Sequence, residues 1–360
     1  MSNFTVDPDF LLQAADRWQE LSDDHAHFFD VLDRAAALEM PPPDSVAGKA
    51  ADGTPELVAA SRSAVARVQG LLGVISTNLS DTATAYRQNE HEQVERTRGI
   101  WDELGHPGQF PVQDISDDIA QPNAPIVHHM PSVRADMGRA LTPSLRSSDL
   151  SLAVLNFDFM WRRESMSVVG TILKAITGWS PDSMLEQLKP DIEVLAKMCD
   201  AFVILTHGYG ELAVCHARDS RVTMQRWHGD SADMAMDYFL TVEEWYNARV
   251  IRIFNAVAQH YGTAAADLFT VAKQLGYWLE MFTGVFNDLV TAAQSVQAKD
   301  SAGVFLALMQ MFVDAAGMMG KIGSTFLELV KVANLVASGT RRLLEDGVDT
   351  IELTLPSRIR

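Results

Sequence analysis

Residues 58–86 read VAASRSAVARVQGLLGVISTNLSDTATAY, and this stretch decides the fold. Its apolar and small residues recur at alternating spacings of three and four, which is the pattern of a coiled-coil seam. The seam weakens slightly where it carries a serine or a threonine. Its members are Val58, Ser61, Val65, Val68, Leu72, Ile75, Leu79, Thr82 and Tyr86. We therefore predict a long helix that packs along a partner helix.

The preceding stretch supplies that partner. Asp7-Pro8-Asp9 provides an N-cap acid followed by proline at the first helical position. A packed stripe with helical spacing then runs along Leu11, Ala15, Trp18, Leu21, His25, Phe28 and Leu32, and three prolines at 41–43 end it. Residues 7–100 are therefore expected to form an antiparallel helical hairpin, with arms of about 45–65 Å at 1.5 Å per residue.

Proline placement separates the rest of the chain. Eleven of the 14 prolines precede residue 144, so the remainder has room for long helices. A stripe from Leu188 to Leu212 predicts a helix that ends near Arg226. The next helix, with Asp230 or Ser231 as its N-cap, should run past His260. Further helices are expected over 275–292 and 301–345, while the tail at 350–355 is expected to be irregular.

These patterns predict an all-α protein, an elongated bundle of long antiparallel helices. The expected organisation is a hairpin over residues 1–103, a proline-rich linker over 104–149, a second helical domain over 150–300, and an apolar C-terminal helix with a tail over 301–360.

Composition narrows the possible partners. The chain is 47% apolar and carries a formal net charge of -18. Nucleic-acid binding depends on a cationic surface, so no nucleic-acid partner is expected. Two cysteines, Cys199 and Cys215, are too few for a disulfide scaffold, and one helix would hold them about 24 Å apart.

The sequence contains none of the familiar catalytic motifs. It lacks a Gly-x-Ser-x-Gly elbow, a phosphate-binding glycine loop and a His-Glu-x-x-His pair. The pairs His91–Glu92 and His128–His129 have no further ligands at suitable spacing. We expect no enzymatic activity, no catalytic residues, no cofactor and no metal site.

Two short motifs stand at helix ends. Tyr86-Arg87-Gln88-Asn89-Glu90 is a Tyr-x-x-x-Glu that closes the seam, with Glu90 one turn beyond Tyr86 on the same face. Trp227-His228-Gly229 is a Trp-x-Gly between two long helices, where glycine permits a tight turn. Alternatively, Trp227 is an ordinary core aromatic at a helix corner, and Tyr86 with Glu90 marks a frayed helix end.

With these motifs in this order, the chain resembles substrates of the actinobacterial type VII (ESX) secretion systems. It is similar to the Trp-x-Gly and PE–PPE-like superfamily, in the EspB-like architecture. The resemblance implies a composite export signal made of Trp227, Gly229, Tyr86 and Glu90, which the secretion machinery reads on a folded substrate. It also implies a secreted or cell-envelope protein without a Sec signal peptide, in agreement with the lack of a basic and apolar leader at residues 1–8.

The implied partners are an ATPase or chaperone of the type VII machinery and a second copy or a related helical protein. Residues 302–320 are apolar and rich in methionine, which predicts a helix buried in the bundle or, alternatively, a helix that docks on a partner or inserts into a membrane. The side chains singled out there are Met309, Met311, Phe312, Met318 and Met319. Two alternatives stay open: a membrane-inserting, pore-forming region of a type VII toxin system, with residues 301–345 in the bilayer, or a cytosolic helical adaptor.

Overall fold

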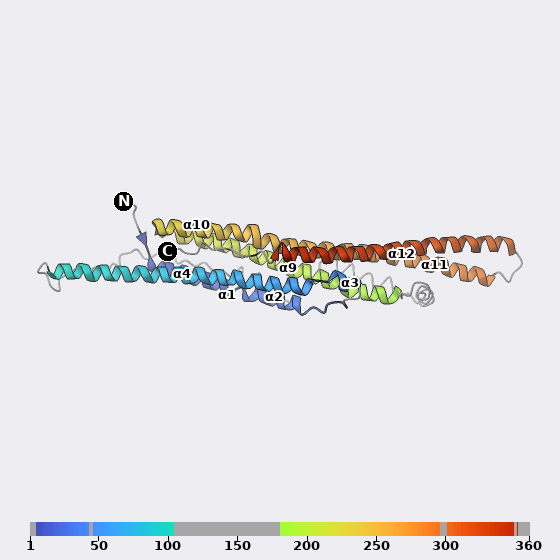
Figure 1. Cartoon of the computed structure of the whole chain (residues 1–360), viewed down its shortest axis with the longest axis horizontal. Coiled ribbons are helices and arrows are strands. Elements are labelled where there is room, and N and C mark those ends of the chain that lie inside the picture. Colours follow the sequence, from blue (N-terminus) through green and yellow to red (C-terminus); the bar gives the residue numbers. More distant parts are fainter. Residues whose placement is uncertain (1–4, 43–45, 104–180, 296–300, 349–350, 352–360) are drawn as a thin grey trace.

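The computed structural model describes residues 5–42, 46–103, 181–295, 301–348 and 351. In these residues the protein is an elongated all-α bundle, which confirms the predicted fold class (Figure 1). The long helices are α4 (Thr54–Glu103), α9 (Pro181–Met224), α11 (Arg252–Ser295) and α12 (Ser301–Glu345). The predicted linker at 104–149 lies outside the described residues.

The predicted hairpin is confirmed, with one correction. Its second arm is α4, and the seam from Val58 to Leu79 is buried, while Thr82 and Tyr86 are half-buried. Its first arm is two helices, α1 (Pro8–Asp23) and α2 (Ala26–Ala36), rather than one. A short helix, α3 (Val46–Ala50), lies within the connection between the arms.

The break between α1 and α2 is marked by side-chain hydrogen bonds to the backbone, some with α4 and one within the break itself. The side chain of Gln69 on α4 donates to the carbonyl of Ser22 at 3.2 Å, and the Ser22 hydroxyl donates to the Gln69 carbonyl at 3.1 Å. The His25 ring bonds the Leu21 carbonyl at 2.9 Å through Nδ1. The Leu21 and Ser22 carbonyls both accept side-chain hydrogen bonds. The backbone here therefore forms hydrogen bonds across three residues, as in a 3₁₀ turn, such as His25 N–H to the Ser22 carbonyl.

The second half begins with α9, which ends at Met224, close to the predicted position. After the predicted break at 227–229 come α10 (Asp230–Trp245), a π-helical turn η1 (Tyr246–Ile251), and α11. The separate helix expected at 275–292 is wrong, because α11 continues through it to Ser295. The helix α12 has the predicted bounds.

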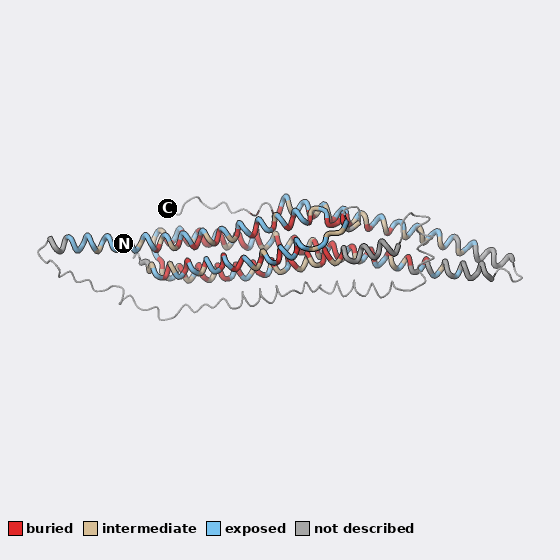
Figure 2. Tube along the Cα trace, turned by 90° about the horizontal axis from the view of Figure 1, so that it is seen from below, coloured by how far each residue is buried: buried red, intermediate tan, exposed pale blue. Residues whose placement is uncertain are grey.

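One hydrophobic core joins the two halves. It takes side chains from α1, α2, α4, α9, α10, α11 and α12. Buried residues concentrate in the middle of the bundle, and the described residues toward both ends are more exposed (Figure 2). At one end α4 continues alone beyond the other helices, and at the opposite end α11 and α12 extend as a pair (Figure 1).

A candidate export-signal site at one end of the bundle

The Trp-x-Gly turn forms a short strand against the N-terminal segment. Strand β2 (Trp227–His228) pairs antiparallel with β1 (Thr5–Val6), with Val6 opposite Trp227. The Trp227 side chain is 3% exposed, so it is packed in the core. The guanidinium of the preceding Arg226 lies over the ring of Phe10, 4.9 Å from its centroid. The turn is therefore held by residues at the start of α1.

Gly229 is the N-cap of α10. Its φ of 122° and ψ of 178° belong to a region that residues with a Cβ rarely adopt. The Gly229 carbonyl accepts the N–H groups of Ala232 at 2.9 Å and Asp233 at 3.1 Å. The predicted N-cap at Asp230 or Ser231 is therefore wrong by one or two positions. Asp230 and Asp233 instead stand in the first helical turn, where the helix dipole favours acids.

The N-terminal segment links this turn to α1. Asp7 is the predicted N-cap, and its Oδ1 accepts the backbone N–H of Phe10 at 3.1 Å. Residues 5–10 thus contain the strand that pairs with Trp227, the cap of α1, and the aromatic ring under Arg226. Sequence reasoning found the cap and missed the strand, because two residues carry no pattern that predicts pairing.

The Tyr-x-x-x-Glu segment reaches the same six residues. Arg87, inside this motif, forms an ion pair with Asp9 of α1. Tyr86 is half-buried and packs against the core, whereas Glu90 is exposed. Beyond Tyr86 the described side chains of α4 are almost all exposed. Both motifs therefore lie at one end of the bundle, each in contact with residues 5–10.

The methionine-rich part of α12 lies near the opposite end. Met309 is 49% exposed, and Met311, Met318 and Met319 are half-buried, while the side chain of Phe312 is outside the description. No side chain described between 309 and 324 is buried. Among the described residues, no helix combines the length and apolar character needed to cross a bilayer.

Two histidines are buried where the hairpin meets the second half. Burial lowers the pKa of His25 to about 4, although a hydrogen bond to the Leu21 carbonyl acts in the opposite direction. Burial lowers the pKa of His216 to about 4 in the same way, against its bond to the Phe239 carbonyl. In the described part of the chain, His, Cys, Asp and Glu nowhere gather in a group of three suited to a metal ion.

Comparison with protein families, with characterised proteins and with solved structures finds no match for this chain.

Proposed function

We propose that the protein is a substrate of a type VII secretion system, exported folded and without enzymatic activity. The proposal continues the sequence resemblance. The single observation that carries it is that Arg87 of the Tyr-x-x-x-Glu segment pairs with Asp9 while Trp227 pairs with Val6. Two motifs separated by more than a hundred residues thus meet the same short segment, as a composite signal requires.

The two motifs would have different roles in recognition. Trp227 is buried, so it holds the turn rather than touching the machinery directly. Glu90 is exposed on α4 and is available to a partner, whereas the neighbouring Arg87 is engaged by Asp9. The proposed reader, an ATPase or chaperone of the machinery, would therefore bind the exposed face of α4 next to a turn kept in shape by Trp227 and Gly229.

Export by a host that carries a type VII system tests the proposal. Tyr86→Ala and Glu90→Ala should each reduce the ratio of secreted to cell-associated protein at least tenfold. Tyr277→Ala and Glu92→Ala are matched controls, because both side chains are exposed and neither belongs to a motif. They should export normally. Normal export of the Tyr86 and Glu90 variants would contradict the proposal.

Trp227 needs a second variant, because loss of a buried indole also destabilises the bundle, by about 3–5 kcal/mol. Trp227→Phe keeps most of the volume, so it should retain both the turn and export, whereas Trp227→Ala should lose export. Thermal unfolding of the purified variant separates the two effects. If Trp227→Phe and Trp227→Ala both export like the parent protein, the turn is not part of the signal.

Once exported, the protein is proposed to act by assembly with a second copy or a related helical protein. Exposed apolar side chains support this: Val313 and Leu327 on α12 are 62% and 61% exposed, and Tyr277 on α11 is 55% exposed. Light scattering on the purified chain should show an oligomer that Val313→Lys dissociates. A monomer at all concentrations would contradict self-assembly.

A further inference from the structure

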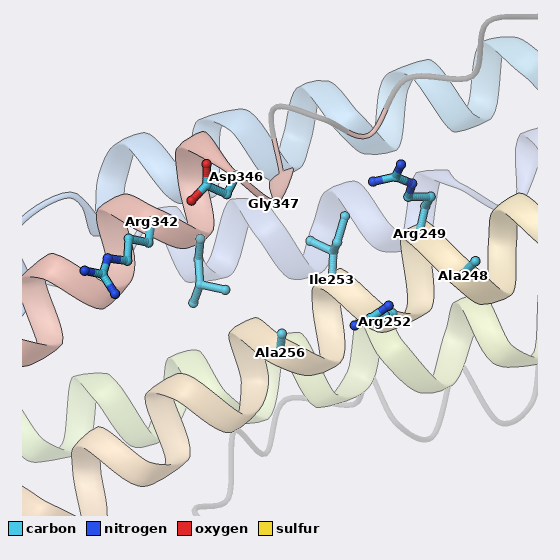
Figure 3. Close-up of a pocket in the computed structure, with 9 residues that line it drawn as sticks. Ala248, Arg249, Arg252, Ile253, Ala256, Arg342, Asp346 and Gly347 are labelled. Carbon is cyan, nitrogen blue, oxygen red and sulfur yellow. The ribbon is translucent and has the colours of Figure 1, made fainter.

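A pocket of about 440 Å³ opens on the flank of the bundle, away from the proposed export signal. One wall comes from η1 and the start of α11, with Arg249, Arg252 and Ile253. The other comes from the C-terminal end of α12, with Arg342, and from Asp346 directly after it (Figure 3). In Figure 3, Ile253 points from α11 toward α12, between Arg249 and Arg342. The volume is in the range of small-molecule sites.

The lining concentrates positive charge in an acidic protein. Three arginines face one aspartate, so the lining carries a formal charge of 3 − 1 = +2, against -18 for the whole chain. Within the described residues, none of the ion pairs involves Arg249, Arg252 or Arg342. Elsewhere arginines meet acids of other helices, as Arg62 meets Asp33. Asp346 is the single acid among these lining residues, so the lining keeps an excess of positive charge.

The π-helical turn positions two of these arginines. A π turn accommodates one extra residue, which rotates the following helix face by about 100° relative to an unbroken α-helix. Tyr246 and Val250 of η1 stay fully buried in the core, while Arg249 and Arg252 are exposed at the pocket. Such turns are rare in α-helices and occur frequently at functional sites.

We propose that this pocket binds a small organic phosphate monoester. Guanidinium groups pair with phosphate oxygens through two parallel hydrogen bonds. A phosphate monoester carries about -1.5 to -2 charges at pH 7, which matches the +2 lining, whereas a single carboxylate would neutralise only half of it. The apolar side chains of Ile253, Ala256 and Leu343 would contact the organic part.

Calorimetry on the full chain with phenyl phosphate, and with phenol as the phosphate-free control, tests the assignment. We expect binding of phenyl phosphate that weakens with added salt, and no binding of phenol. Arg249→Ala and Arg252→Ala should each lower the affinity about tenfold or more, the loss of one charge-assisted hydrogen bond. Arg252→Lys keeps the charge but lacks the planar guanidinium, so its affinity for phenyl phosphate should lie between those of the parent protein and Arg252→Ala.

Arg67→Ala is the matched control, because it removes an exposed arginine of α4 and changes the net charge equally. It should bind phenyl phosphate like the parent protein. An equal loss in Arg67→Ala and Arg252→Ala would mean general charge attraction and would overturn the site. So would the absence of phenyl phosphate binding. A second measurement tests binding to vesicles with phosphomonoester headgroups. Binding to the vesicles without binding of phenyl phosphate would contradict the proposal of a small-molecule ligand.

Discussion

Trp18 donates its indole N–H to Nδ1 of His216, 3.2 Å away, although 198 residues separate the two in the sequence. The other ring nitrogen of His216 therefore carries its proton and donates to the Phe239 carbonyl at 3.1 Å. Trp18 also stacks on the Phe239 ring, with centroids 5.1 Å apart. One buried group thus ties α1 of the hairpin to α9 and α10 of the second half.

Replacing Trp18 should therefore loosen the contact between the halves. In Trp18→Phe, the smaller ring leaves space in the core and Nδ1 of His216 loses its donor, so we expect a loss of about 2–4 kcal/mol in unfolding free energy. Urea unfolding followed by helical circular dichroism measures it. Trp278→Phe, at a half-buried ring over which Lys321 lies, should change stability by less than about 1 kcal/mol. Equal effects would contradict a special role for Trp18.

Local sequence predicts some parts of this fold, whereas other parts depend on residues far away in the chain. The seam from Val58 to Leu79 repeats a spacing set by the helix itself, so local sequence suffices. The Asp24–His25 break was missed because His25 continues the apolar stripe, and the interruption comes from the His25 ring on the Leu21 carbonyl together with Gln69 of another helix. The pairing of Val6 with Trp227 likewise depends on a distant partner. The two motifs could be found in the sequence, whereas the contacts of residues 5–10 with both of them could not.

Acid should destabilise the protein through its buried histidines. His25 and His216 have folded pKa values of about 4 against an ordinary 6.5, so the unfolded chain binds protons more readily. The contribution of these neutral histidines to the free energy of unfolding is complete above pH 6.5. It is lost as the pH falls from 6.5 to 4, and the loss reaches about 3 kcal/mol for each histidine. Urea unfolding at several pH values in this interval measures the slope.

The variant His216→Gln isolates one of these contributions. A glutamine can accept from Trp18 and donate to Phe239, yet it does not titrate. Between pH 6.5 and 4 the variant should lose about 3 kcal/mol less stability than the parent protein. Identical slopes would show that His216 is not a buried neutral base in the folded state. Carboxylate titration is common to both proteins and cancels in the comparison.

Alanine substitutions at two nearby glycines of α9 should change the stability in opposite directions. A Cβ at Gly208 would lie 2.3 Å from Cε1 of Phe28, a buried ring of α2 that stacks on Tyr209. Gly208→Ala must displace that ring and should cost about 1–3 kcal/mol, beyond the gain in helix propensity. A Cβ at Gly210 meets nothing within 4 Å, so Gly210→Ala should stabilise by about 0.5–1 kcal/mol. Thermal unfolding of both variants is decisive, since equal signs would contradict the close contact between α2 and α9.

Gly229 tests whether the shape of the Trp-x-Gly turn matters. With φ at 122°, a side chain at this position is strained, and Gly229→Ala should cost about 1–3 kcal/mol. The strain falls where β2 pairs with β1, so amide exchange at Val6 should also become faster than in the parent protein. Gly70→Ala, at an exposed α4 position with open space around the added methyl, should instead be neutral or stabilising. If Gly229→Ala leaves both stability and exchange at Val6 unchanged, the turn tolerates a side chain, and the glycine of the motif is not required to hold Trp227 against the N-terminal strand.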